Sequence, residues 1–216
     1  MTAPRILYLH GFGSGPRSAK GMAFADHLAA RGLVVDRLDL RVPSFEHLRL
    51  SAMLEVVRTA IPPTDRAIVI GSSLGGLTAA RVAEGDPRIF ALVLLAPAFQ
   101  LATRWQQLPG WSEWERTGWR QMHDHTTGGT AQVDFGFVQD LGAIDVGFPD
   151  VRVPTLILHG TADDAVPIEF SRRFAEGRPN VQLIELADDH QLIASIPRLL
   201  AETDRFLARV LDPVAG

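Results

Sequence analysis

A Gly-x-Ser-x-Gly turn directly after an apolar run is the feature that most constrains how this chain folds. Gly71-Ser72-Ser73-Leu74-Gly75 follows Ala67-Ile68-Val69-Ile70 and precedes a stretch of small residues. A serine on a sharp strand-to-helix turn needs glycines two residues before and after it, because side chains there would clash where the two elements cross. The pattern therefore predicts a strand, a turn and a helix that present the Ser73 hydroxyl as a nucleophile for acyl transfer.

A glycine-rich phosphate loop or an ordinary tight turn is the alternative for this segment. A phosphate loop carries Gly-x-x-x-x-Gly-Lys-Ser/Thr, and the single lysine of the chain, Lys20, is remote from the turn in sequence. The missing lysine favours the nucleophile turn. Because so short a pattern also arises by chance, the assignment depends on finding partners for Ser73 elsewhere in the chain.

Apolar runs alternate with helical patterns along the chain, which is typical of a parallel sheet with helices on both faces. We expect one α/β domain over residues 1–216, with a mostly parallel sheet of about six strands. The expected strands are Arg5–Leu9, Val34–Leu38, Ala67–Ile70, Ala91–Leu95, Thr155–Leu158 and Gln182–Glu185. The expected helices are Ser18–Arg31, Phe45–Ala60 with Ser44 as its N-cap, Leu74–Glu84, Ile168–Glu176 and one that starts after Ser195 and runs to about Val210.

Residues 99–150 interrupt this alternation. The segment is long and irregular, and it follows an expected strand, at the sheet edge where ligands bind in open parallel sheets. It holds all four tryptophans, Trp105, Trp111, Trp114 and Trp119. We expect a small lid, or cap, whose tryptophans contact substrate; the alternative is a helical excursion whose tryptophans pack on the sheet.

Composition excludes several classes of protein. The net charge of −4 and the scattered arginines favour neither nucleic acid nor a membrane surface as partner. The chain has no cysteine, which excludes disulfides, thiolate metal sites and a cysteine nucleophile. The run Ile6-Leu7-Tyr8-Leu9 is too short for a signal-peptide core and is expected to form a strand. We expect a cytoplasmic protein that acts on a small molecule; the oligomeric state stays open.

A serine hydroxyl needs a base within hydrogen-bond reach, and His190 is the best placed of seven histidines. It lies between the last expected strand and the last helix, in a loop that opens on the same sheet edge as Ser73. His10 and His159 each follow a strand and precede a glycine, where a buried structural role is expected. His27 and His47 are expected to face solvent, and His123 and His125 belong to the insertion.

The group that orients the base should come from another loop on that edge. Asp163 and Asp164 both follow the expected strand Thr155–Leu158 and compete for this role. Asp188 and Asp189 adjoin His190 itself, where a carboxylate is rarely in line with the imidazole. A metal site built from Asp163, Asp164, Asp189 and His190 is a weaker alternative, because no ligand spacing of a known metal motif is present.

The developing oxyanion of an acyl-transfer reaction needs preorganised donors. The backbone N–H of Leu74, directly after the nucleophile, is one candidate. The glycine-rich loop that begins at His10-Gly11-Phe12-Gly13 follows the first strand and offers the N–H of Phe12 as the second. The loop is not a dinucleotide fingerprint, since no acidic residue takes the ribose role.

With these residues placed, the chain resembles the alpha/beta-hydrolase superfamily over nearly its whole length. Four blocks match in order: His10-Gly-Phe-Gly-Ser-Gly, Gly71-Ser-Ser-Leu-Gly-Gly, His159-Gly-Thr-Ala-Asp-Asp-Ala-Val-Pro and Asp189-His190. In such His-Gly-x-x-Asp blocks the first aspartate is the acid, which corresponds to Asp163. Tyr8-Leu-His-Gly-Phe with Gly15-Pro-x-Ser-x-Lys20 is similar to small bacterial serine esterases of this superfamily.

The resemblance implies a serine hydrolase that cleaves carboxylic esters through an acyl-enzyme, with Ser73, His190 and Asp163 as its triad and no metal or cofactor. A thioesterase, acyltransferase or peptidase with the same triad is the alternative. A binding protein that kept the fold and lost turnover is a further one. The insertion matches no pattern of the family, so the substrate does not follow from the resemblance.

Overall fold

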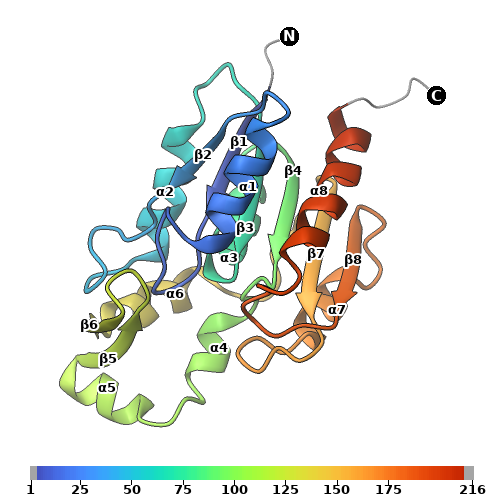
Figure 1. Cartoon of the computed structure of the whole chain (residues 1–216). Coiled ribbons are helices and arrows are strands. Elements are labelled where there is room, and N and C mark those ends of the chain that lie inside the picture. The colour runs from blue at the N-terminus through green and yellow to red at the C-terminus, as the bar shows by residue number, and fades with distance from the viewer. Residues whose placement is uncertain (1–3, 212–216) are drawn as a thin grey trace.

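The computed structural model describes residues 4–211 and contains a six-stranded sheet in which all neighbouring strands run parallel (Figure 1). Its strands lie in the order β2-β1-β3-β4-β7-β8. They are β1 (Arg5–Leu9), β2 (Val35–Leu38), β3 (Ala67–Ser72), β4 (Ile89–Leu95), β7 (Thr155–Gly160) and β8 (Val181–Leu186). Each corresponds to an expected strand within one or two residues, and the predicted parallel sheet is confirmed.

Helices cover both faces of the sheet, and each face has its own apolar core (Figure 1). Ile6 and Tyr8 of β1 pack with α1 (Ala19–Ala29) and α8 (Ile196–Leu211). Leu7 and Leu9, which point to the opposite face, pack with α2 (Leu50–Ala60), α3 (Leu74–Ala83) and α7 (Glu169–Ala175). Because both faces are covered, the central strands β3 and β4 are almost continuously apolar instead of alternating. Within residues 4–211, no helix is both long and apolar enough to cross a membrane.

The predicted start of the second helix was wrong. Helix α2 begins at Leu50 instead of Phe45, and Ser44 is not its N-cap. The carboxylate of Asp140, remote in sequence, accepts the backbone N–H of Ser51 at 2.8 Å and its hydroxyl at 2.6 Å. A free N–H of the first turn is thus satisfied by a tertiary contact, which local spacing could not indicate.

The insertion contains three helices and a β-hairpin. They are α4 (Leu101–Trp105), α5 (Trp111–Thr117), the antiparallel pair β5 (Trp119–Asp124) and β6 (Gly129–Asp134), and α6 (Gly136–Ile144). The hairpin was not predicted. Its turn needs Gly128, whose φ is +73°, and the carboxylate of Asp124 accepts the backbone N–H of Thr126 at 2.9 Å. The sequence Thr126-Thr-Gly-Gly is the local signal that indicates such a turn.

Two arginines between β2 and α2 hold this hairpin. Arg41 forms a two-bonded ion pair with Asp124, with N–O distances of 3.0 and 2.9 Å. Arg49 does the same with Asp134, at 2.7 and 3.0 Å. Two-bonded ion pairs of this kind fix the orientation of the two side chains as well as the distance between them.

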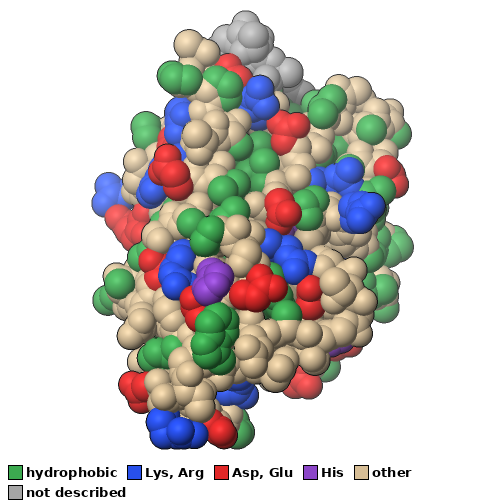
Figure 2. All heavy atoms as spheres, turned by 90° about the vertical axis from the view of Figure 1, so that its left-hand side faces the viewer, with side chains coloured by type: hydrophobic (Ala, Val, Ile, Leu, Met, Phe, Trp, Pro, Cys, Tyr) green, Lys and Arg blue, Asp and Glu red, His purple; other side chains and the backbone are tan. Residues whose placement is uncertain are grey.

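Figure 2 views the molecule from the left-hand side of Figure 1, and acidic and basic side chains are interspersed on this face.

Candidate active site

Ser73 lies on the sharp turn between β3 and α3 that the sequence predicted. Its φ of 52° is in a region that side-chain-bearing residues rarely adopt, and such strain is typical of functional turns. A Cβ at Gly71 would overlap the backbone of Gly75, and one at Gly75 would overlap the carbonyl oxygen of Leu9. Both glycines are therefore required for the crossing of strand, helix and the neighbouring strand β1.

The structure brings Ser73, His190 and Asp163 into a hydrogen-bonded row. Nε2 of His190 lies 3.1 Å from Oγ of Ser73, and Nδ1 of the same ring lies 2.7 Å from Oδ2 of Asp163. The loops after β3, β7 and β8 each supply one of the three side chains. Because Asp163 can only accept, Nδ1 carries the proton, which leaves Nε2 free to accept the proton of the serine hydroxyl.

Asp163 is held by four donors. Its Oδ1 accepts the backbone N–H groups of Ala165 and Val166, at 3.0 and 2.7 Å, and its Oδ2 accepts both His190 and Nε2 of the fully buried His159. Burial raises the pKa of Asp163, but the bonds from His159, His190 and Val166 outweigh it and hold the pKa well below its usual range. The carboxylate is therefore ionised at neutral pH.

The other aspartates considered from sequence have different surroundings. Asp164 is exposed, and its neighbour Asp163 takes the position beside the imidazole. Asp188 accepts the backbone N–H groups of Asp189 and Ser195, each at 2.8 Å, so it orders the loop instead of orienting His190. A Cβ at Gly160 would overlap the carbonyl oxygen of Asp188, which shows how closely this loop packs on the end of β7.

The loop after β1 packs directly beside Ser73. A Cβ added at Gly11 would lie 3.3 Å from the Cβ of Ser73. Leu74 is the first residue of α3, where a backbone N–H has no partner within the helix. Within residues 4–211, the N–H of Phe12 has no hydrogen-bond partner either. Two free donors thus stand close to the Ser73 hydroxyl, as an oxyanion hole would require.

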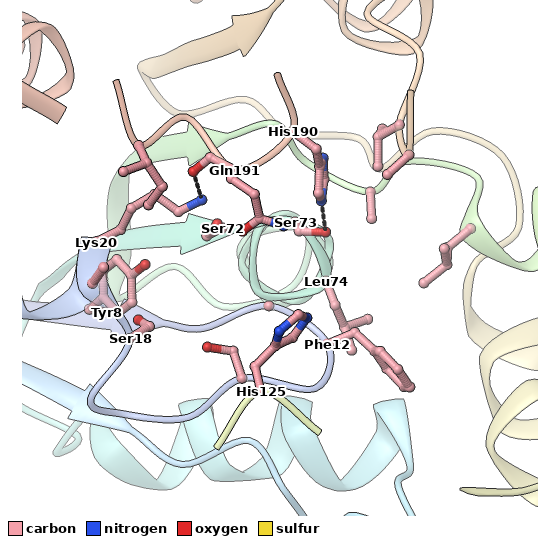
Figure 3. Close-up of a pocket in the computed structure, with 18 of the residues that line it drawn as sticks. Tyr8, Phe12, Ser18, Lys20, Ser72, Ser73, Leu74, His125, His190 and Gln191 are labelled. Atoms are coloured by element: carbon pink, nitrogen blue, oxygen red, sulfur yellow. Dashed lines mark hydrogen bonds between the residues drawn. The ribbon is translucent and has the colours of Figure 1, made fainter. Parts of the chain in front are cut away.

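A cavity of about 540 Å³ opens over Ser73 and has two different ends (Figure 3). Figure 3 shows Tyr8, Ser18 and Lys20 on one side of the serine, and Leu74 and Phe12 on the other. Ala98, Leu101 and Trp105 also line the cavity and add apolar surface. The volume is that of a small-molecule site, and the polar and apolar ends imply a substrate with both kinds of surface.

Of the four tryptophans, all within the described residues, Trp105 lines the cavity and the other three do not. The ring of Trp105 meets that of Phe12 edge-on, with centroids 5.2 Å apart. Trp114 is buried in the core, where its Nε1 donates to the carbonyl of Val133 at 3.0 Å. Trp111 packs on Trp114, and Trp119 is 41% exposed. The prediction of substrate contact therefore does not fit Trp111, Trp114 and Trp119, because the folding of the insertion turns them elsewhere.

The residues of the cavity that were assigned no role from sequence include Tyr8, Lys20, Arg104 and His125. His125 reaches it because its backbone N–H donates to the carbonyl of Gly13 at 2.7 Å, which brings the tip of the hairpin onto the loop after β1. Tyr8 and Lys20 did give a signal in the sequence, as the single tyrosine and the single lysine of the chain and as members of the block that resembles small bacterial serine esterases. The others are common residue types without a motif.

Comparisons with known proteins agree with the fold. The model of the uncharacterised protein family UPF0227 matches residues 5–206. No curated protein matches the sequence. The structure is similar to alpha/beta hydrolase domain-containing protein 10 from mouse (TM-score 0.80, 22% identity, 95% of this chain and 90% of that one). It is also similar to Est1E from Butyrivibrio proteoclasticus with bound ferulic acid (TM-score 0.79, 21% identity, 97% of this chain and 90% of that one). A third similar structure is the enol-lactonase from Burkholderia xenovorans (TM-score 0.62, 19% identity, 96% of this chain and 92% of that one). The chain therefore has the alpha/beta-hydrolase fold.

Proposed function

The chain belongs to the uncharacterised protein family UPF0227, and we propose that it is a serine hydrolase that cleaves carboxylic esters through an acyl-enzyme. One observation carries the proposal: the continuous row from Ser73 through His190 to Asp163, in which Ser73 and His190 line the cavity and two free backbone donors lie beside the serine. Similar solved structures include an esterase with ferulic acid bound and an enol-lactonase, which supports hydrolysis of a carboxylic ester as the class of reaction.

The proposed reaction follows from these positions. Oγ of Ser73 attacks the ester carbonyl carbon while Nε2 of His190 takes its proton, and Asp163 stabilises the imidazolium through Nδ1. The N–H groups of Phe12 and Leu74 stabilise the oxygen that becomes negative. His190 then gives its proton to the departing alcohol. A water molecule, deprotonated by the same nitrogen, attacks the acyl carbon and releases the acid and free Ser73.

The test compares Ser73→Ala with a serine substitution that lies away from the cavity. On p-nitrophenyl butyrate, we expect Ser73→Ala to lower kcat by about 10³-fold or more, since the nucleophile is lost. Ser112→Ala, at an exposed position of α5, should retain wild-type kcat. A fluorophosphonate probe should label Ser73, as seen by mass spectrometry of the digested protein.

Two results would contradict the proposal: Ser73→Ala that keeps most of its turnover, or a fluorophosphonate that leaves Ser73 unmodified. The same assay separates the alternative leaving groups. Acyl-CoA or an amide hydrolysed much faster than simple esters, with loss of both activities in Ser73→Ala, would indicate a thioesterase or a peptidase on the same triad.

A further inference from the structure

The charged side chains that line the cavity are all basic. Arg17, Lys20 and Arg104 contribute to its wall, and no aspartate or glutamate of the described residues does, although the whole chain has a net charge of −4. Simple aliphatic esters carry no charge for such groups to bind. The composition of the wall therefore points to a further feature of the substrate at this site.

Lys20 is the most unusual of these groups. It is only 9% exposed, and its Nζ donates to the backbone carbonyl of Gln191 at 2.7 Å. An ammonium group has three donors, and within residues 4–211 this is the one hydrogen bond that Nζ makes. Burying a lysine is costly, so an incompletely satisfied ammonium group beside a cavity needs a reason.

The hydroxyl of Tyr8 has even fewer contacts. Tyr8 is 1% exposed, and in the described part of the chain its hydroxyl oxygen has no hydrogen-bond partner of normal geometry. Burial raises the pKa of Tyr8 to about 12, although the hydroxyls of Ser18 and Ser72 lie close enough to oppose the shift. The group is therefore a protonated donor at neutral pH. A buried polar group without a partner is rare, and because Tyr8 lines the cavity, its hydroxyl is available to donate to a polar group of a ligand.

The N-terminus of α1 adds to the same end of the cavity. Oγ of Ser18 accepts the backbone N–H of Gly21 at 3.2 Å, so the hydroxyl proton of Ser18 remains available to another acceptor. A Cβ at Gly21 would lie 2.9 Å from the ring of Tyr8, so this glycine lets the first turn of the helix approach the tyrosine. The first turn of an 11-residue helix also carries positive partial charge.

We propose that Lys20, Tyr8 and Ser18 form a subsite for an anionic oxygen group of the substrate, so that the preferred ester carries a carboxylate at a distance from the scissile bond. This inference rests on the proposed function, because it concerns the substrate of the same Ser73. Lys20 supplies the charge, while the two hydroxyls donate hydrogen bonds to the carboxylate oxygens. Figure 3 shows the three side chains grouped on the side of Ser73 away from Phe12.

A purely structural role for Lys20 is the competing explanation. Its bond to Gln191 joins α1 to the loop that carries His190, so its loss could slow every substrate by displacing the base. Such an effect is the same for charged and neutral esters, since both use His190. The displacement of His190 therefore cancels in the ratio of kcat/KM for a charged ester to kcat/KM for a matched neutral ester. A change in this ratio measures the contribution of the subsite alone.

The experiment uses two pairs of fluorogenic esters. The first compares the 4-methylumbelliferyl monoester of adipic acid with 4-methylumbelliferyl heptanoate, which has a similar length and a terminal methyl group. The second compares 7-acetoxycoumarin-3-carboxylate with 7-acetoxycoumarin and places the carboxylate on the leaving group. We expect wild-type protein to prefer the charged ester in one pair, and Lys20→Met to lower that ratio by about tenfold or more.

Three further variants control for charge and folding. Lys20→Arg should keep most of the preference, because it keeps the positive charge. Tyr8→Phe removes only the unpartnered hydroxyl, so it should fold normally and lower the ratio several-fold. Arg116→Met removes one positive charge at an exposed position of α5 and should leave the ratio unchanged.

The pH dependence gives a separate readout. Burial lowers the pKa of Lys20 to about 8, against the opposing charges of Asp163, Asp188 and Asp189. Lys20 thus loses its charge as the pH rises through about 8, and the preference should decline over the same range while Tyr8 keeps its proton. The other basic groups on this cavity are Arg17, Arg104, His125 and His190. His190 acts on both esters of a pair, and burial lowers the pKa of His125, which leaves it neutral over this range.

The outcomes for the subsite and for the proposed function are distinct. Loss of the preference in Lys20→Met and in Tyr8→Phe supports the subsite. Turnover of the neutral esters that depends on Ser73, without a preference for the charged ester in either pair, overturns the subsite and leaves the hydrolase intact. A preference that survives in both variants also overturns it. Turnover that is independent of Ser73 overturns the proposed function itself.

Discussion

The loops at the carboxyl end of the sheet and the insertion over residues 99–150 meet at one cavity but are built in different ways. Ser73, Asp163 and His190 each stand within a few residues of a strand end, so the sheet itself determines where they lie. Residues of the insertion reach the cavity through long-range contacts, such as the bond from the N–H of His125 to the carbonyl of Gly13. The sheet edge thus holds the three side chains of the proposed triad, while the insertion forms part of the cavity wall and of the core.

The sharpest test of the sheet edge separates two adjacent aspartates. In Asp163→Asn, His190 loses the acceptor that holds its proton on Nδ1, and we expect kcat on p-nitrophenyl butyrate to fall by about 10³- to 10⁴-fold. Asp164→Asn, one residue later and exposed, should keep wild-type kcat. Equal losses in the two variants would show that charge in this loop, rather than contact with His190, matters.

Substitutions in the insertion should change the stability of the protein. Trp114→Ala removes a buried indole from the core and a hydrogen bond to Val133, and we expect it to lower the free energy of unfolding by about 3–5 kcal/mol. Trp119→Ala, at a position 41% exposed, should change it by less than about 1 kcal/mol. Urea unfolding followed by circular dichroism measures both. If Trp114→Ala were as stable as wild type, the indole of Trp114 would not contribute to the packed core.

The smallest expected effect tests whether the insertion touches substrate at all. Trp105→Ala removes apolar surface from the cavity, and we expect kcat/KM for p-nitrophenyl esters of medium chain length to fall by about tenfold. Trp119→Ala, which does not reach the cavity, serves as the matched control and should keep wild-type values. If Trp105→Ala also kept wild-type values, Trp105 would have no part in binding these esters.

The sequence predictions were more accurate for the sheet and its edge than for the insertion. Six strands and the turn at Ser73 were predictable because their patterns are local: continuous apolar runs, and two glycines at a fixed spacing from a serine. The choice of Asp163 over Asp164 came from a resemblance, since adjacent aspartates carry equivalent local signals. The start of α2 was misplaced because the N–H of Ser51 is satisfied by Asp140, nearly ninety residues later.

The position of the insertion could be predicted from the sequence, but its structure could not. Its four tryptophans have the same side chain but differ in burial and in contact with the cavity. These differences depend on which face of a short helix or strand the rest of the molecule covers. Similarly, the sequence around Tyr8, the single tyrosine of the chain, does not indicate whether its hydroxyl has a hydrogen-bond partner. Its unpartnered hydroxyl becomes visible only when α1 is packed against that strand.

Residue order alone was thus sufficient to predict the parallel sheet, the loops that leave its carboxyl edge and the loops on which Ser73, His190 and Asp163 meet. Strand ends in such a sheet converge on one edge whatever the loops do, so side chains a few residues beyond them are confined to a small region. The shape and charge of the cavity required the folded chain. They arise where α1, the hairpin tip and the His190 loop meet. Contacts between segments so distant in sequence produce no periodic pattern from which they could be predicted.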